Sequence, residues 1–148
     1  PTNWRCSVQT HGKPGSSDAL AGFTGNANVD DDSDGLPALV EHLLGSSDSD
    51  SGEGLGLISS GLIDVVGLSS TTTHLSLTFR RVLGTDDLSA VPEVSSTLLA
   101  GSWQTGEAHV VMVSQIHQGD GTVIETWRSV AAVASTEKVF MRLRVTAN

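Results

Sequence analysis

A single acidic loop places the tightest constraint on how this chain can fold. The segment from Asp30 to Glu41 reads DDDSDGLPALVE and satisfies every fixed position of the pattern D-x-[DN]-x-[DN]-G-x5-E. A loop of this kind winds tightly enough for carboxylates to converge on one point, and the glycine permits its sharpest turn. The predicted ligands are the side chains of Asp30, Asp32, Asp34 and Glu41 and the backbone carbonyl of Leu36.

The ligand chemistry of this loop favours Ca²⁺ as its cofactor. Calcium takes roughly six to eight oxygen ligands, whereas magnesium keeps its waters and prefers octahedral geometry. Ala38, at the ninth loop position, has no side-chain oxygen, so we expect a water to serve there. The alternative is a solvated acidic loop that caps a helix. Carboxylates this close repel one another without a cation, so we expect the ion.

A short helix is predicted directly after the acidic run. Residues 36–44 carry apolar side chains at helical spacing, with Pro37 in the first turn and Gly45 just past the end. The apolar positions are Leu36, Leu39, Val40, Leu43 and Leu44. They would hold the helix against a core and so fix the direction of Glu41.

The rest of the chain alternates with the period of β-strands. Leu75, Leu77 and Phe79 lie on one face of a predicted strand, and Gln118–Gly121 separates two alternating runs as a hairpin turn would. The other expected strands cover 55–59, 62–66, 88–95, 109–117, 122–128 and 139–145. The pattern predicts a mainly β fold, an antiparallel β-sandwich of the fibronectin type III or immunoglobulin kind.

The first residues form a separate strand-like segment. Trp4, Cys6 and Val8 alternate with polar residues in the predicted strand 1–9. A short strand is unstable by itself, so we expect it to join a sheet edge, in its own subunit or in a neighbouring copy. Head-to-tail addition between copies would build a filament. The predicted division of the chain is strand 1–9, linker 10–28, calcium loop and helix 29–54, and sandwich 55–148.

Further oxygen-bearing side chains flank the acidic loop. They follow no fixed ligand spacing, and ordinary loop hydrogen bonding competes with a second ion as their explanation. These residues are Asn26, Asn28, Asp31, Asp48 and Asp50.

Composition and motifs exclude several functions. The net charge of −9 would repel a phosphate backbone, so nucleic acid is not an expected partner. The chain has no apolar run of membrane-spanning length. It has no G-x-S-x-G elbow, phosphate loop or dinucleotide fingerprint, so we expect no enzyme activity. Because it begins at Pro1, we expect a processed product or a fragment of a longer protein.

Tryptophan offers one route to a glycan-binding function. Trp4, Trp103 and Trp127 would suit a sugar-stacking platform if they were exposed together. With no Tyr and only three Phe in the chain, their use in the core is the competing interpretation.

Three segments together resemble a known arrangement. The run DSDGLPALVEHLLG, the run EVSSTLLAGSW and the terminal VFMRLRV are similar to C-terminal calcium-loop and sandwich regions of large secreted bacterial proteins, over residues 28–146. The loop itself resembles those of dockerins and thrombospondin type 3 repeats. A dockerin needs two such loops and this chain has one, so cohesin binding is not implied. The resemblance implies an extracellular, non-catalytic protein.

The sequence therefore predicts an extracellular calcium-binding structural module that associates with copies of itself. The alternative is a glycan-binding or adhesive module of a larger secreted protein.

Overall fold

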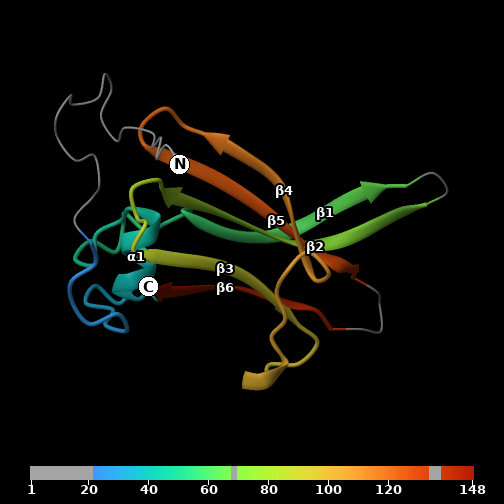
Figure 1. The fold of residues 1–148 in the computed structure, drawn as a ribbon, viewed down its shortest axis with the longest axis horizontal. Helices are drawn as coiled ribbons and strands as arrows, with labels where there is room; N and C mark the ends of the chain where they lie inside the picture. The colour runs from blue at the N-terminus through green and yellow to red at the C-terminus, as the bar shows by residue number, and fades with distance from the viewer. Residues whose placement is uncertain (1–21, 68–69, 134–137) are drawn as a thin grey trace, which may run out of the picture.

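The computed structural model describes residues 22–67, 70–133 and 138–148. In these residues the protein is mainly β, as the alternating pattern predicts (Figure 1). The elements are α1 (Ala38–Leu44), β1 (Ile58–Val66), β2 (Thr71–Val82), β3 (Leu88–Ser95), the 3-10 turn η1 (Ala100–Ser102), β4 (Val110–His117), β5 (Thr122–Ala132) and β6 (Phe140–Ala147). The predicted strand 1–9 and the linker up to residue 21 lie outside the described residues.

All strand pairs of the described residues are antiparallel, and they form two sheets. The larger sheet has the order β1-β2-β5-β4, and the smaller one consists of β3 and β6. The predicted hairpin joins β4 to β5, and its glycines Gly119 and Gly121 adopt φ values of 82° and 85°. Glycine takes this left-handed backbone region without a steric penalty, which explains why the turn forms here.

Two predicted strands are in fact one. The sequence predicts separate strands at 55–59 and 62–66, but β1 runs through Gly61 from Ile58 to Val66. Each β1 residue pairs with one residue of β2, so the hydrogen-bonded ladder continues where the side-chain pattern is interrupted. Leu55 lies outside the strand and is exposed.

Helix α1 begins two residues later than the apolar pattern predicts and ends where predicted. Pro37 is its N-cap, and Gly45 ends it with a φ of 78°. A β-carbon on Gly45 would lie 2.6 Å from Cγ2 of Val82, so only glycine allows the helix end to approach β2 this closely. No helix among the described residues has the length and hydropathy needed to cross a membrane.

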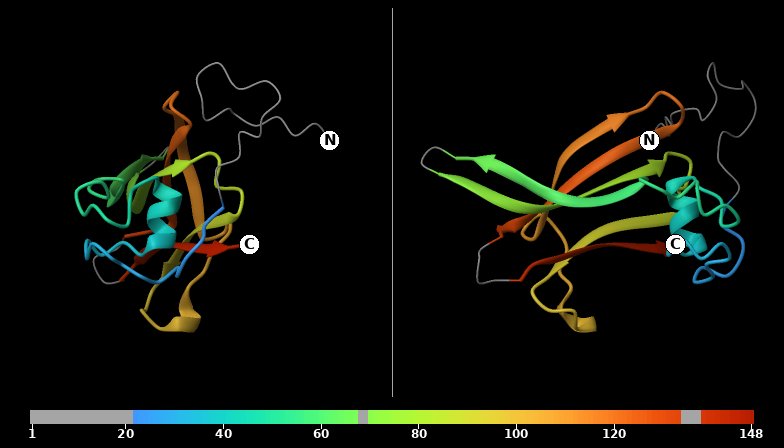
Figure 2. Two further views of the ribbon diagram at one scale, coloured as in Figure 1. Left: turned by 90° about the vertical axis from the view of Figure 1, so that its left-hand side faces the viewer. Right: turned by 180° about the vertical axis from the view of Figure 1, so that it is seen from behind.

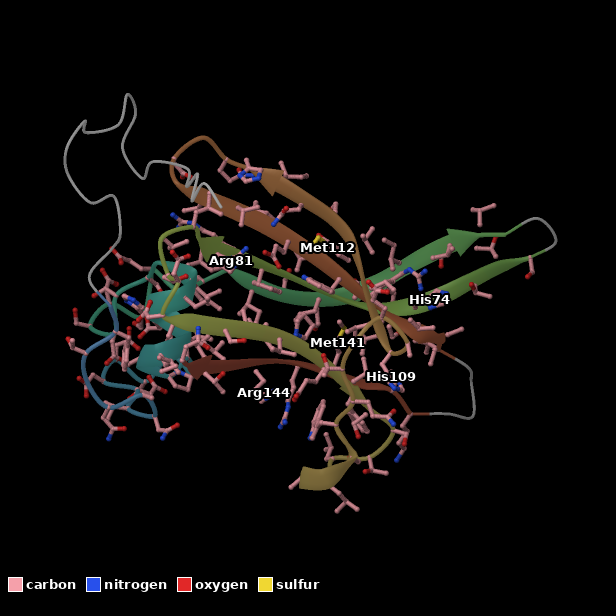
Figure 3. All side chains as sticks on the ribbon, viewed as in Figure 1. His74, Arg81, His109, Met112, Met141 and Arg144 are labelled. Carbon is pink, nitrogen blue, oxygen red and sulfur yellow. The ribbon has the colours of Figure 1, made fainter. Side chains whose placement is uncertain are left out.

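The core lies between the two sheets and under α1. Leu39 and Leu43 pack with Leu88, and Leu44 packs with Leu77 and Phe79. Met141 reaches the second cluster from β6, between the sheets, while Arg144 lies on the outer face of the same strand (Figure 3). Figure 2 shows α1 and the acidic loop at one end of the strands and the end of β1 with the start of β2 at the other.

Candidate metal centre

The three aspartates of the predicted site converge in the folded chain. One carboxylate oxygen from each of Asp30, Asp32 and Asp34 lies within 4.8 Å of the others. The loop's own backbone N–H groups orient them: Asp34 donates to Asp32 Oδ1 over 3.1 Å, and Gly35 donates to Asp30 Oδ2 over 3.1 Å. Gly35 has a φ of 94°, where a side chain would be strained. The local turn therefore points several oxygens at one location.

Helix α1 carries the fourth predicted carboxylate, Glu41, which is not part of the group of oxygens within 4.8 Å formed by Asp30, Asp32 and Asp34. Glu41 is only 1% exposed, although it is charged in its ordinary state. Its neighbours Leu39, Leu43 and Leu44 are buried in the core and fix the helix rotation, which turns Glu41 inward. Its Oε1 accepts a hydrogen bond from Ser46 Oγ at 3.2 Å.

Three buried oxygens of the predicted ligands lack a hydrogen-bond partner among the described residues. They are Asp30 Oδ1, Asp32 Oδ2 and Glu41 Oε2. An unsatisfied buried polar atom costs roughly 1–3 kcal/mol, and more when it carries charge. Three such atoms from predicted ligands of one ion are what a hard cation would satisfy, because calcium binds oxygen ligands. The residues present therefore fit Ca²⁺.

The pKa values of Glu41 and Asp32 are raised, as expected for carboxyls that lie close together without a cation. The pKa of Glu41 is raised to about 7, mainly by burial and also by its interaction with the Asp48 carboxyl and by the charges of Asp32 and Asp34, against the lowering effect of the hydrogen bond from Ser46. Burial also raises the pKa of Asp32, as do the charges of Asp34, Asp30 and Asp48, while a hydrogen bond from the backbone of Asp34 opposes this. A bound cation would attract the ionised carboxylates and lower the pKa of both residues.

The segment after α1 folds back against the acidic loop. Asp48 Oδ1 accepts a hydrogen bond from the backbone N–H of Asp31 at 3.0 Å, and its carboxyl also faces Glu41. Gly54 is buried beside the carboxylate of Asp34, and a β-carbon there would collide with that carboxylate and lie 2.8 Å from Leu36 Cδ1. The loop is thus enclosed by residues outside the motif.

The five residues considered for a second ion are distributed unevenly. Asn26, Asp31 and Asp48 line a cavity of about 660 Å³ together with Ala38 and Glu41. The side chains of Asn26 and Asp50 accept local turn hydrogen bonds, from Asn28 N at 3.2 Å and from Gly52 N at 3.0 Å respectively. Asn28 instead lines a separate groove beside β6. The structure therefore brings Asp31 and Asp48 next to the predicted site and leaves Asp50 in its own turn.

Spacing alone did not single out Ser46 or Gly54. Ser46 follows the helix directly and returns to Glu41, and Gly54 matters through its missing side chain. Neither belongs to a ligand motif, and both contacts depend on how the segment 46–54 turns back.

The tryptophans of the described chain occupy different surroundings. Trp103 stacks under the guanidinium of Arg142, whose Cζ lies 4.1 Å from the ring centroid. Trp127 packs against the cluster of Leu44, Leu77 and Phe79, and its Nε1 donates to Glu125 Oε2 at 3.0 Å. Trp4 lies outside the described residues.

No known protein family, curated protein or solved structure matches this chain.

Proposed function

We propose that this chain is a non-catalytic, calcium-binding structural module of an extracellular protein. Asp30, Asp32, Asp34 and Glu41 would hold the ion with their side chains, and Leu36 with its backbone carbonyl. The observation that carries the proposal is that three predicted ligands, Asp30, Asp32 and Glu41, each have a buried oxygen without a partner among the described residues. The convergence of the three aspartates within 4.8 Å supports it.

The ion would have a structural role, in fixing α1 on the strands. The acidic loop continues into α1, and α1 packs against both β2 and β6 through Leu39, Leu43 and Leu44. Calcium would neutralise the loop and hold Glu41 in its buried position, so the helix would be fixed on the end of the strands. Ion binding would then stabilise the whole domain by mass action.

We also propose that the two sheets form an immunoglobulin-like sandwich. In constant-type domains the strands, lettered in chain order, form the sheets A-B-E-D and C-F-G. Lettered in the same way, the order β1-β2-β5-β4 is A-B-E-D, and the pair β3-β6 is C-F. The sheet order and the antiparallel pairing both support this assignment.

Calcium titration tests the proposed function directly. We expect the melting temperature to rise with calcium and to fall on chelation, and calorimetry to show binding. Glu41→Gln should abolish most of this response, because it removes the charge that faces the buried site. Glu53→Gln is the matched control, since Glu53 is an exposed carboxylate in the segment 46–54 that follows α1. A melting temperature indifferent to calcium and chelator in the unmodified chain would refute the proposal.

A glycan-binding module has less support from the geometry. One face of Trp103 is occupied by Arg142, and Trp127 contributes to the core. A stacking platform needs aromatic faces that are open together. We therefore propose the structural role ahead of glycan binding.

A further inference from the structure

The smaller sheet is incomplete along one edge of β6. In the described residues β6 pairs with β3 and with no other strand. Under the immunoglobulin-like assignment β6 corresponds to strand F, and the next strand of that sheet, G, would lie on this free edge. A free strand edge presents unpaired N–H and C=O groups, which can accept another strand.

On the larger sheet, an apolar side chain opposite this edge is also more exposed than expected for the interior of a sandwich. Across the interior, β6 packs against β2, and β3 packs against β4. This places β1 beyond the edge of the smaller sheet. Leu62 of β1 pairs with Leu75 and so shares the inward face of Leu77 and Phe79, yet it is 65% exposed. At the other end of the same strand face, Ile58 packs against the cluster of Leu44, Leu77 and Phe79.

A groove runs between the free edge and α1. Its volume is about 280 Å³, and Leu143 and Val145 of β6 line it together with Leu39 and Val40 of α1. Leu143 and Val145 are only half-buried. An extended segment with one apolar face would fill this space and pair with β6 at once, as in β-strand addition.

We infer that the segment Trp4–Gln9 of the same chain is this missing strand. Its apolar residues Trp4, Cys6 and Val8 alternate with Arg5, Ser7 and Gln9. One face would therefore point between the sheets, toward Leu62, and the other toward solvent. This inference does not depend on the calcium site.

The connection is long enough for the segment to reach β6 of its own subunit. The described chain starts beside the end of β6: Phe23 N donates to Asp87 Oδ2 at 2.7 Å, and Asn148 N donates to Asp87 O at 2.8 Å. The 8 residues of β6 span roughly 26 Å. Residues 10–21 can span at most about 40 Å. Because the tether suffices, the high effective concentration of the attached segment favours its own subunit over a neighbour.

Hydrogen exchange on the full, calcium-saturated chain tests the inference. We expect the β6 amides that do not bond to β3 to be protected, and Trp4→Ser with Val8→Ser to speed their exchange by roughly tenfold or more. The Trp4→Ser, Val8→Ser variant should also have a lower melting temperature than the unmodified chain. Arg5→Ser with Gln9→Ser is the matched control, because it changes the solvent face of the same segment, and it should leave both readouts unchanged.

A double-mutant cycle places the segment against β1. Leu62→Ser should lower the melting temperature of the full chain, although Leu62 is 65% exposed among the described residues. The same substitution should have little effect in the Trp4→Ser, Val8→Ser background, because the contact is already lost. Additive effects of the two changes would contradict the assigned position.

Two results would overturn the inference. In the first, β6 exchange is equally fast in the unmodified chain and in the Trp4→Ser, Val8→Ser variant, so the segment does not pair there. In the second, light scattering finds the full chain polymeric and the chain without residues 1–9 monomeric. The segment would then enter a neighbouring copy and build a head-to-tail filament. A full chain that stays monomeric at high concentration supports pairing within the subunit.

Discussion

At the scale of single residues, Glu41 is the least exposed charged side chain in the described part of the chain. It is a carboxylate with 1% exposure, and its Oε2 has no partner among the described residues. Its pKa is raised, mainly by burial, to about 7 from 4.5. The residue is therefore held at a place that suits a negative charge only when a cation is present.

The raised pKa of Glu41 predicts that the free energy of unfolding of the calcium-free protein falls as the pH rises from 4.5 to about 7, the reverse of the usual dependence for a carboxyl group. Between pH 4.5 and about 7 the folded chain keeps a proton on Glu41 that the unfolded chain releases. Since the folded state then binds more protons, the free energy of unfolding falls as the pH rises through this window. Glu41→Gln should flatten the slope, and Glu53→Gln should retain it, in urea denaturation with a chelator present. Equal slopes for the two variants would argue against Glu41 as the titrating group.

Gly54 provides a second residue-scale test. Gly54→Ala should weaken calcium binding, because the new methyl group would displace the Asp34 carboxylate and press on Leu36. Gly101→Ala is the control, since a β-carbon at Gly101 meets nothing within 4 Å. Calorimetric titration of both variants measures the difference. Unchanged affinity in Gly54→Ala would show that Asp34 does not need its present position to bind the ion.

At the scale of elements, α1 connects the acidic loop to the strands. Leu44 is fully buried against Leu77 and Phe79. Leu44→Ala should lower the free energy of unfolding by about 2–5 kcal/mol, the usual cost of removing a buried leucine side chain. Leu55→Ala should change it by no more than about 0.5 kcal/mol, because Leu55 is 77% exposed. Urea denaturation with calcium present provides the comparison.

The pairing of β3 with β6 contains a buried charge. Glu93 is 6% exposed and accepts hydrogen bonds from Arg142 Nε at 2.9 Å and from Arg144 Nε at 2.7 Å. Burial alone would raise the pKa of Glu93, but the hydrogen bonds and charges of Arg144 and Arg142 outweigh it and lower the pKa below 4.5. The stability from this cluster is therefore present above pH 4.5 and is lost as the pH falls through the lowered pKa.

Glu93→Gln tests this cluster. At neutral pH it should lower the free energy of unfolding by about 1–3 kcal/mol, because charge-assisted hydrogen bonds are lost. The difference from the unmodified chain should shrink in acid, where Glu93 is protonated. Glu107→Gln, at an exposed position, is the control. A difference that stays constant with pH would contradict the ionic origin of the effect.

At the scale of the whole molecule, the acidic loop and the strands should unfold together. Helix α1 contributes Leu39 and Leu43 to one core cluster and Leu44 to the other, so it has no separate core. We expect one transition, seen equally by circular dichroism and by tryptophan fluorescence, whose midpoint rises with calcium. Two transitions, with calcium shifting only one of them, would mean that the loop is an independent unit.

The sequence by itself determined the features that depend on neighbouring residues. The spacing of the aspartates and Gly35 predicted a loop that gathers carboxylates, and Asp30, Asp32 and Asp34 do lie together. Alternation predicted the strands and the β4–β5 hairpin, because side-chain direction follows the local backbone period. The tertiary structure decided what depends on distant segments: the continuity of β1 through Gly61, the return of Asp48 and Gly54 to the acidic loop, and the free edge of β6. These contacts join residues far apart in the chain, and which of them form depends on how the sheets and α1 pack, for which local periodicity carries no information.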